Sequence, residues 1–266
     1  MTPQVPEQLT LAAVRFLNTR PLIYGLEQQP DLRLMLDVPA KLIDALETKQ
    51  ADVALLPVID YQRYAGLRIV PSAGIGSFGE TLTVRIFSHC PIGHVKTLAC
   101  DPDSHTSVAL ARIILAELFA IHPEFVDLRR ATDGPNGARL LIGDKVVCEA
   151  PQGFPHELDL GEAWKQLTGL PFVFAIWMAR EGVDLRDLPQ RLERAKRQGL
   201  EHVEELIERH AVPMGWPREL ARKYLTQHLR FDIGPRELEA IACFHQLAAK
   251  HGLVANPINP LRLYGD

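Results

Sequence analysis

Short apolar runs alternate with helical patterns over the first two-thirds of this chain of 266 residues, and no other feature constrains its fold as strongly. Residues 9–17, 52–56, 97–100 and 172–178 have the composition of strands, whereas residues 41–49 and 104–121 carry apolar side chains at helical spacing. Further strands are expected at residues 67–71, 82–88, 139–142 and 145–148, and a helix at residues 159–167. This alternation is typical of parallel sheets covered by helices, so we expect an α/β fold.

The last third of the chain has a different pattern. After Arg180 the spacing of apolar residues is helical throughout, and no segment is a good strand candidate. Charged residues occupy the faces opposite the apolar stripes, as in helices that cover a core. The sequence therefore predicts four helices in this region.

Two of the expected strands, 82–88 and 172–178, are placed to carry the chain between two lobes. The segment that they enclose, about 85 residues long, is within the usual size range of a domain. We expect a first lobe made of residues 1–86 and 178–266 and a second lobe made of residues 87–177. A ligand would then bind in the cleft between them, where strand ends and helix N-termini meet.

Composition excludes several classes of function. The formal net charge is −4, which disfavours a broad basic surface for nucleic acid. The longest apolar run, residues 172–179, is much too short to span a membrane, and the N-terminus lacks the features of an export signal. The cysteines show no paired spacing, which argues against disulfides and a zinc site; they are Cys90, Cys100, Cys148 and Cys243. We expect a reduced, soluble, cytoplasmic protein.

A glycine-rich segment, Gly74 to Gly79, matches the spacing of a dinucleotide-binding loop. Such a loop must open a helix, so that the pyrophosphate meets the positive end of the helix dipole. Here a β-type run, residues 81–87, follows instead. The segment is therefore interpreted as a glycine loop that leads into a crossing strand.

Two segments have the character of anion sites. Asn18-Thr19-Arg20-Pro21 follows a strand, and Ser104-His105-Thr106-Ser107 opens the helix expected at 104–121. A helix N-terminus offers free N–H groups and a positive dipole end, which suit a carboxylate. Ordinary helix capping explains the same residues and stays open as the alternative. Two such sites, one in each lobe, would suit a small molecule with two carboxylates.

At these residues the chain resembles the chorismate dehydratases of the futalosine route to menaquinone. The matching segments are residues 14–26, 51–61, 101–115, 140–145, 159–180 and 231–241, which span nearly the whole chain. The start VRFLNTRPL, the helix entry SHTSVALAR and the stretch LGEAWKQLTGLPFVFA are specific in combination. The resemblance implies the fold of type 2 periplasmic binding proteins, with two α/β lobes joined by two hinge strands and a ligand cleft between them.

The resemblance also implies a reaction. Chorismate would lose its C3 proton and its C4 hydroxyl as water to give 3-[(1-carboxyvinyl)oxy]benzoate, with no cofactor and no metal. The resemblance implies Asn18 and Thr83 as catalytic residues near the leaving oxygen. The expected substrate-binding residues are Thr19, Arg20, Pro57, Ser104, Thr106, Ser107 and Gly143. Leu56 is expected beside Pro57 in an apolar wall. The protein would act as a monomer or a homodimer, without a nucleic-acid or membrane partner.

The matched segments supply no clear protein base for the C3 proton. Asp144 and Glu162 lie in them, but Asp144 is placed to begin or end a strand and Glu162 to stabilise the first turn of a helix. We therefore expect the enolpyruvyl carboxylate of the substrate itself to take the proton.

The chain departs from the family pattern at three positions. It has Phe16 where the family usually has Tyr, Arg20 where a small or apolar residue is commoner, and Thr83 where the family carries a Ser. Two other functions compete: a 1,4-dihydroxy-6-naphthoate synthase-like enzyme, whose expected cysteine- and proline-rich start is missing here, and a non-catalytic protein that binds small carboxylates.

Overall fold

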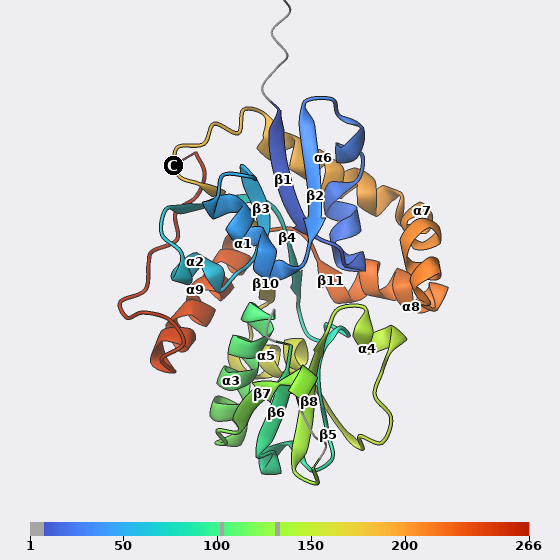
Figure 1. Cartoon of the computed structure of the whole chain (residues 1–266), viewed down its shortest axis with the longest axis vertical. Coiled ribbons are helices and arrows are strands. Elements are labelled where there is room, and N and C mark those ends of the chain that lie inside the picture. The colour runs from blue at the N-terminus through green and yellow to red at the C-terminus, as the bar shows by residue number, and fades with distance from the viewer. Residues whose placement is uncertain (1–7, 102–103, 131–133, 266) are drawn as a thin grey trace, which may run out of the picture.

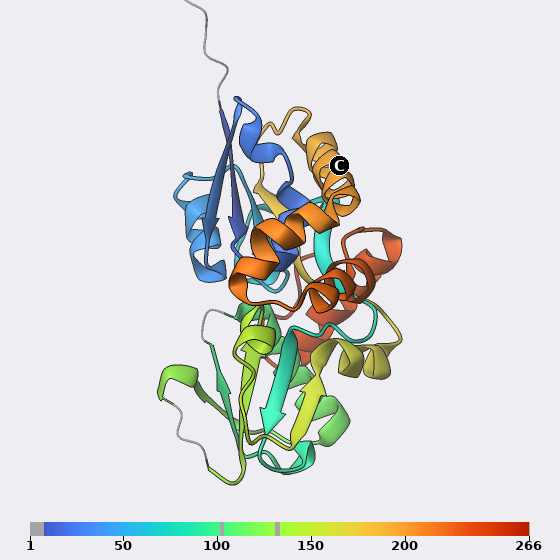
Figure 2. The same cartoon turned by 90° about the vertical axis from the view of Figure 1, so that its right-hand side faces the viewer.

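Two mixed β-sheets, one in each lobe, form the framework of the computed structural model, which describes residues 8–101, 104–130 and 134–265. Figures 1 and 2 show the lobes one above the other. The first sheet has the order β11-β4-β10-β3-β1-β2, made of Leu229–Arg230, Leu67–Ser77, Phe172–Arg180, Val53–Pro57, Leu9–Val14 and Leu32–Asp37. The second has the order β7-β6-β8-β5-β9, made of Glu124–Asp127, Thr97–Cys100, Gly137–Ile142, Val84–Ser88 and His156–Asp159.

The expected parallel sheets are only partly parallel. β1 runs parallel to β2 and β3, and β6 runs parallel to β7 and β8. β10 is antiparallel to β3 and β4, and β5 is antiparallel to β8 and β9. The chain crosses between the lobes just before β5 and just before β10. Each of these strands therefore enters its sheet at the end opposite to that at which its paired neighbours begin.

Neither expected crossing strand joins the lobes. β5, within the expected 82–88 strand, pairs only in the second sheet, and β10, within the expected 172–178 strand, pairs only in the first. The chain leaves the first sheet after Ser77 and returns to it at Phe172. The sheets therefore divide the chain near 78–83 and 169–171, rather than at 86/87 and 177/178, because strand pairing and not apolar content decides sheet membership.

The core of the first lobe lies on both faces of its sheet. Leu11 and Ala13 of β1 face α6 (Leu188–Glu201), whereas Ala12 and Val14 face α1 (Pro39–Glu47). The predicted C-terminal helices are α6, α7 (Val203–Leu206), α8 (Arg218–Lys223) and α9 (Pro235–Lys250). Figure 1 shows α6 to α8 on one side of the sheet and α9 with the short α2 (Asp60–Arg63) on the other.

The second sheet is packed against α3 (His105–Phe119) and α5 (Leu160–Thr168). Residues 145–148, expected to be extended, form the short helix α4 instead, because Gly143 turns the chain with a φ of +67° directly after β8. The two-residue strand β11 corrects the prediction that no strand follows Arg180. No helix in the described part of the chain is long and apolar enough to cross a membrane.

Gly74 and Gly76 of the glycine-rich segment lie inside β4 rather than at the start of a helix. A Cβ at Gly74 would lie 2.8 Å from the carbonyl oxygen of Ala175, and one at Gly76 would lie 2.7 Å from that of Phe172. The glycines therefore permit close approach of β10, and the interpretation of this segment as a loop is wrong for Gly74 and Gly76 because they pair within the first sheet.

A buried histidine ties α9 to the first lobe. His245 Nε2 lies 2.9 Å from the Val58 carbonyl oxygen, and its Nδ1 lies 3.0 Å from Gln62 Nε2. Nε2 therefore carries the hydrogen and Nδ1 accepts, so the ring is neutral. Burial lowers the pKa of His245 to about 4.

This histidine should make stability depend on pH. The unfolded chain takes up the proton from about pH 6.5 downward, whereas the folded chain takes it up only near pH 4. The contribution of the neutral His245 to the free energy of unfolding is therefore complete above about pH 6.5 and is lost as the pH falls toward 4. Between these values the free energy of unfolding should fall by about 3 kcal/mol more in the natural protein than in His245→Gln. Denaturant titrations across this range test this, and parallel curves for the two proteins would contradict it.

Candidate active site

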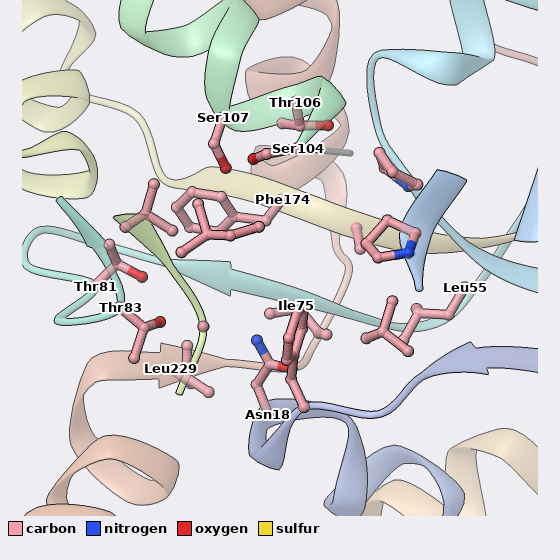
Figure 3. A pocket seen from close by; sticks show the side chains of 18 of the residues that line it. Asn18, Leu55, Ile75, Thr81, Thr83, Ser104, Thr106, Ser107, Phe174 and Leu229 are labelled. Carbon is pink, nitrogen blue, oxygen red and sulfur yellow. The ribbon is translucent and has the colours of Figure 1, made fainter. Parts of the chain in front are cut away.

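A cavity of about 640 Å³ lies between the two lobes (Figure 3). Most of its wall is apolar, including Leu55, Ile75 and Phe174. The polar side chains in the wall are Asn18, Thr81, Thr83, Ser104, His105, Thr106, Ser107 and Tyr224. Among the described residues of this wall none is Lys, Arg, Asp or Glu, so a ligand meets uncharged donors and a single imidazole.

One side of the cavity is the N-terminus of α3. β6 ends at Cys100 at the carboxyl edge of parallel strands, and the buried Leu110, Ile113 and Ile114 anchor the helix behind it. Figure 3 shows the hydroxyls of the three residues Ser104, Thr106 and Ser107 gathered here. We call these three residues the α3 cradle.

The hydroxyls of the α3 cradle are free to meet a ligand. Ser104 precedes the helix but makes no capping hydrogen bond, and its buried Oγ has no partner among the described residues. Thr106 Oγ1 accepts a hydrogen bond of 3.3 Å from the Ile59 N–H, so its own hydrogen remains available. The capping alternative is therefore wrong for Ser104.

Asn18 approaches from the other lobe, as Figure 3 shows. It lies in a 3₁₀ helix, Leu17–Ile23, whose first turn follows Phe16 and has no side-chain cap, so the capping alternative is wrong here too. Gly199 of α6 allows this helix to lie close, since a Cβ there would overlap the Pro21 carbonyl oxygen. The helix thus fixes Asn18 at the cavity wall.

Thr19 and Arg20 do not line the cavity. Thr19 is fully buried, and its hydroxyl donates to Asn18 Oδ1 at 3.4 Å. Arg20 donates to the Arg15 carbonyl oxygen at 3.2 Å and faces a separate cleft with Glu27 and Arg209. A 3₁₀ helix has about three residues per turn, so consecutive side chains point about 120° apart. The structure therefore corrects the prediction that Thr19 and Arg20 face the substrate.

A strained turn presents Thr81 and Thr83 to the cavity. The Thr83 N–H donates to the Thr81 carbonyl oxygen at 2.8 Å, and Leu82 between them has a φ of +68°, which is costly for a residue with a side chain. Asp159 stabilises this geometry: its Oδ1 accepts from the Thr81 N–H at 3.0 Å and its Oδ2 from the Leu82 N–H at 2.9 Å. The same Oδ1 caps α5 through Gly161 and Glu162.

Asp159→Asn should loosen this turn while keeping most of the helix cap, because Asn is as good an N-cap as Asp but can offer only one acceptor. With Oδ1 retained, the amide nitrogen would face the Leu82 N–H, donor against donor. We expect a loss of about 1–3 kcal/mol in the free energy of unfolding, measured by denaturant titration. Glu162→Gln, an exposed neighbour on the same helix, is the control. Equal stability of Asp159→Asn and the natural protein would contradict this role.

Tyr224 completes the polar wall. Its side chain is buried, and its hydroxyl oxygen lies 2.8 Å from Thr83 Oγ1. Burial raises its pKa, so the phenol stays protonated. The ring stacks on Trp216 with centroids 5.0 Å apart. Asn18, Thr83 and Tyr224 thus bring an amide and two hydroxyls together opposite the α3 cradle.

Comparison with known proteins identifies the family. A family model described as menaquinone biosynthesis matches residues 9–250. The chain belongs to the menaquinone biosynthesis family. A chorismate dehydratase of Thermus thermophilus is 30% identical over 239 residues, which cover 81% of this chain and 86% of that protein.

Solved structures show that this family member has a periplasmic-binding-protein-like fold. A protein of Archaeoglobus fulgidus gives a TM-score of 0.71 at 17% identity, covering 94% of this chain and 100% of its own. The periplasmic aliphatic sulphonate binding protein SsuA of Escherichia coli gives 0.64 at 15% identity, covering 95% of both chains. At these identities the likeness concerns the fold alone, and the expected two-lobed fold is confirmed.

Most of the residues singled out in the sequence of this menaquinone biosynthesis family member meet at one cavity. Those that line it are Asn18, Pro57, Thr83, Ser104, Thr106, Ser107 and Gly143. Gly143 approaches closely, since a Cβ there would lie 3.1 Å from the Phe16 ring. In the apolar wall Leu55 takes the place expected of Leu56, because alternate residues of β3 point to opposite faces.

The two acidic residues considered as bases lie outside the cavity wall. Asp144 accepts from Trp216 Nε1 at 3.0 Å and from the Leu17 N–H at 3.4 Å, so it joins the lobes. Burial raises the pKa of Asp144. Glu162 is exposed in the first turn of α5, as expected.

Three polar residues of the cavity wall were not predicted as site residues, although one of them, His105, lies within the predicted segment 104–107. Tyr224 belongs to an apolar helical stripe and resembles a core residue, and Thr81 precedes its strand. His105 lines the cavity with Nδ1 2.9 Å from Oδ1 of the fully buried Asp60 of the other lobe. No local signal marks these contacts, because their partners lie 45 to 141 residues away along the chain.

Proposed function

We propose that this chain is a chorismate dehydratase, a hydro-lyase that converts chorismate into 3-[(1-carboxyvinyl)oxy]benzoate and water. The observation that carries the proposal is the cavity between the lobes, whose described wall holds no Lys, Arg, Asp or Glu and places hydroxyl and amide donors on opposing sides. The Thermus thermophilus chorismate dehydratase, 30% identical, supports the same assignment.

In this proposal the α3 cradle binds one carboxylate of chorismate. Three hydroxyls and the free N–H groups of the helix provide neutral donors, and the helix dipole adds favourable potential without a counter-ion. A cavity wall that excludes water strengthens each of these hydrogen bonds. The ring would lie against the apolar wall that includes Phe174.

The donors on the other side would act on the leaving group. Asn18 and Thr83 would donate to the C4 oxygen as its bond to carbon breaks, because negative charge grows on that oxygen. The proton from C3 and the hydroxide from C4 together make the water, while the enolpyruvyl ether stays intact and the ring becomes aromatic.

The base in this proposal is the enolpyruvyl carboxylate of chorismate. The described wall offers no carboxylate of its own, and Asp144 and Glu162 lie elsewhere. A chorismate analogue with an amide in place of that carboxylate should not turn over. Full turnover of the analogue would show that the substrate carboxylate is not the base. His105, paired with Asp60, would then be the candidate base.

Incubation of the purified protein with chorismate, followed by proton NMR, tests the function. We expect the ring signals of chorismate to be replaced by those of the aromatic product. Binding of chorismate without conversion would favour a passive carboxylate-binding protein, and absence of binding would exclude both.

A further inference from the structure

The buried hydroxyl of Tyr224 has a geometry that determines where the Thr83 hydrogen can point. The two hydroxyl oxygens lie 2.8 Å apart, so one of them donates to the other. A phenol, with an ordinary pKa near 10, is a far stronger acid than an aliphatic alcohol and is the better donor. Burial keeps it protonated. Asn18 is a second side-chain hydrogen-bond partner of the phenol. On the ground of acidity we assign Tyr224 as the donor and Thr83 Oγ1 as the acceptor of the 2.8 Å bond.

The hydroxyl hydrogen of Thr83 is then available for one further hydrogen bond. Its backbone groups are already used: the N–H donates to Thr81, and the carbonyl oxygen accepts from the Gly143 N–H at 2.8 Å. Figure 3 shows the Thr83 side chain at the cavity. Because Tyr224 donates to Thr83 Oγ1 and both backbone groups of Thr83 are used, the Thr83 hydroxyl hydrogen is left for a ligand in the cavity.

Tyr224 itself is held firmly. Its ring stacks on Trp216 at an interplanar angle of 23°, and the Trp216 indole N–H is fixed by Asp144 at 3.0 Å. Tyr224 opens a π-helical turn, Tyr224–His228, a helix irregularity that is frequent at functional sites. The phenol is therefore preorganised rather than free to rotate.

We propose that Tyr224 is a positioning residue that acts through Thr83, so that the Thr83 hydroxyl donates to the oxygen that leaves C4. This inference rests on the proposed function. During turnover the C4–O bond breaks and its electron pair stays with the departing oxygen, while the C3 proton passes to the base and then to that oxygen. Tyr224 and Thr83 keep their own protons throughout, and only hydrogen bonds change.

A double-mutant cycle tests the proposal. Tyr224→Phe removes only the hydroxyl and should lower kcat about 10- to 30-fold, with KM within about threefold of the natural value. Thr83→Val should lower kcat at least as much. If Tyr224 acts through Thr83, the double variant should be no slower than Thr83→Val alone. A double variant whose loss in kcat equals the product of the two single losses would overturn the proposal. An unchanged kcat in Tyr224→Phe would overturn it as well.

A conservative variant and a matched control separate positioning from stability. In a Thr83→Ser background the hydroxyl is present again, so Tyr224→Phe should again cost about tenfold in kcat. Tyr61→Phe removes another buried hydroxyl, which bonds Pro260 and Arg262 at 2.8 Å outside the cavity wall. It should lower the melting temperature but not kcat. A kcat loss in Tyr61→Phe equal to that in Tyr224→Phe would reduce Tyr224 to a structural residue.

The natural protein is assayed first in the same experiment. If it does not convert chorismate, the proposed function fails. If it converts chorismate but the cycle is additive, only the positioning role of Tyr224 fails.

Discussion

Asn18→Ala should lower kcat about 100-fold and leave the melting temperature almost unchanged. The side chain makes no capping hydrogen bond and lies at the cavity wall, and the bond that it accepts from the Thr19 hydroxyl is long, at 3.4 Å, so its removal should cost the fold little. Loss of one preorganised donor to a developing oxyanion typically costs about 100-fold or more in kcat. Steady-state kinetics with chorismate and thermal unfolding of the same preparation measure both quantities.

A matched variant sharpens this test. Asn259 offers a suitable amide for comparison, because its main chain bonds Gln62 and its side chain lies outside the cavity wall. Asn259→Ala should keep the natural kcat. An Asn18→Ala variant with unchanged kcat and a lowered melting temperature would make Asn18 a structural residue.

Ser107→Asp should weaken binding of chorismate at least about 100-fold while the protein remains folded. Ser107 is the third residue of α3, where an acidic side chain interacts favourably with the helix dipole and stabilises the helix. The same carboxylate would stand in the α3 cradle and repel the carboxylate of the ligand across a short distance. Ser107→Asp should therefore keep or raise the stability of the protein while lowering its affinity for chorismate. A general loss of structure would lower both.

Ser107→Asn is the control for size. It fills a similar volume without charge and should weaken binding less than about tenfold. Isothermal titration with the product measures both variants without turnover. Equal affinities of the Asp and Asn variants would show that no carboxylate of the ligand lies in the α3 cradle.

The parts of the site that were predicted from sequence are those with a local signal. The α3 cradle combines a strand end, a run of hydroxyl residues and a strongly apolar helix, all within about 20 residues. Asn18 follows a strand in the same way. Both segments also carry the family resemblance, so local chemistry and similarity agree there.

The parts that were not predicted depend on distant partners. Asp159 was expected only within a helical segment, yet its carboxylate also accepts hydrogen bonds from Thr81 and Leu82, 78 and 77 residues earlier. Periodicity cannot reveal such a contact, because it reports which face of an element is buried and not what covers it. The error at Thr19 and Arg20 has a local cause, since a 3₁₀ helix and an α-helix direct the same residues differently.

A crystal structure with bound 3-[(1-carboxyvinyl)oxy]benzoate tests the central claim most directly. One carboxylate should lie within hydrogen-bond distance of Ser104, Thr106 or Ser107, and the ring carbon that carried the C4 oxygen should face Asn18 and Thr83. A product bound outside this cavity, or with both carboxylates held by arginine or lysine side chains, would contradict the account.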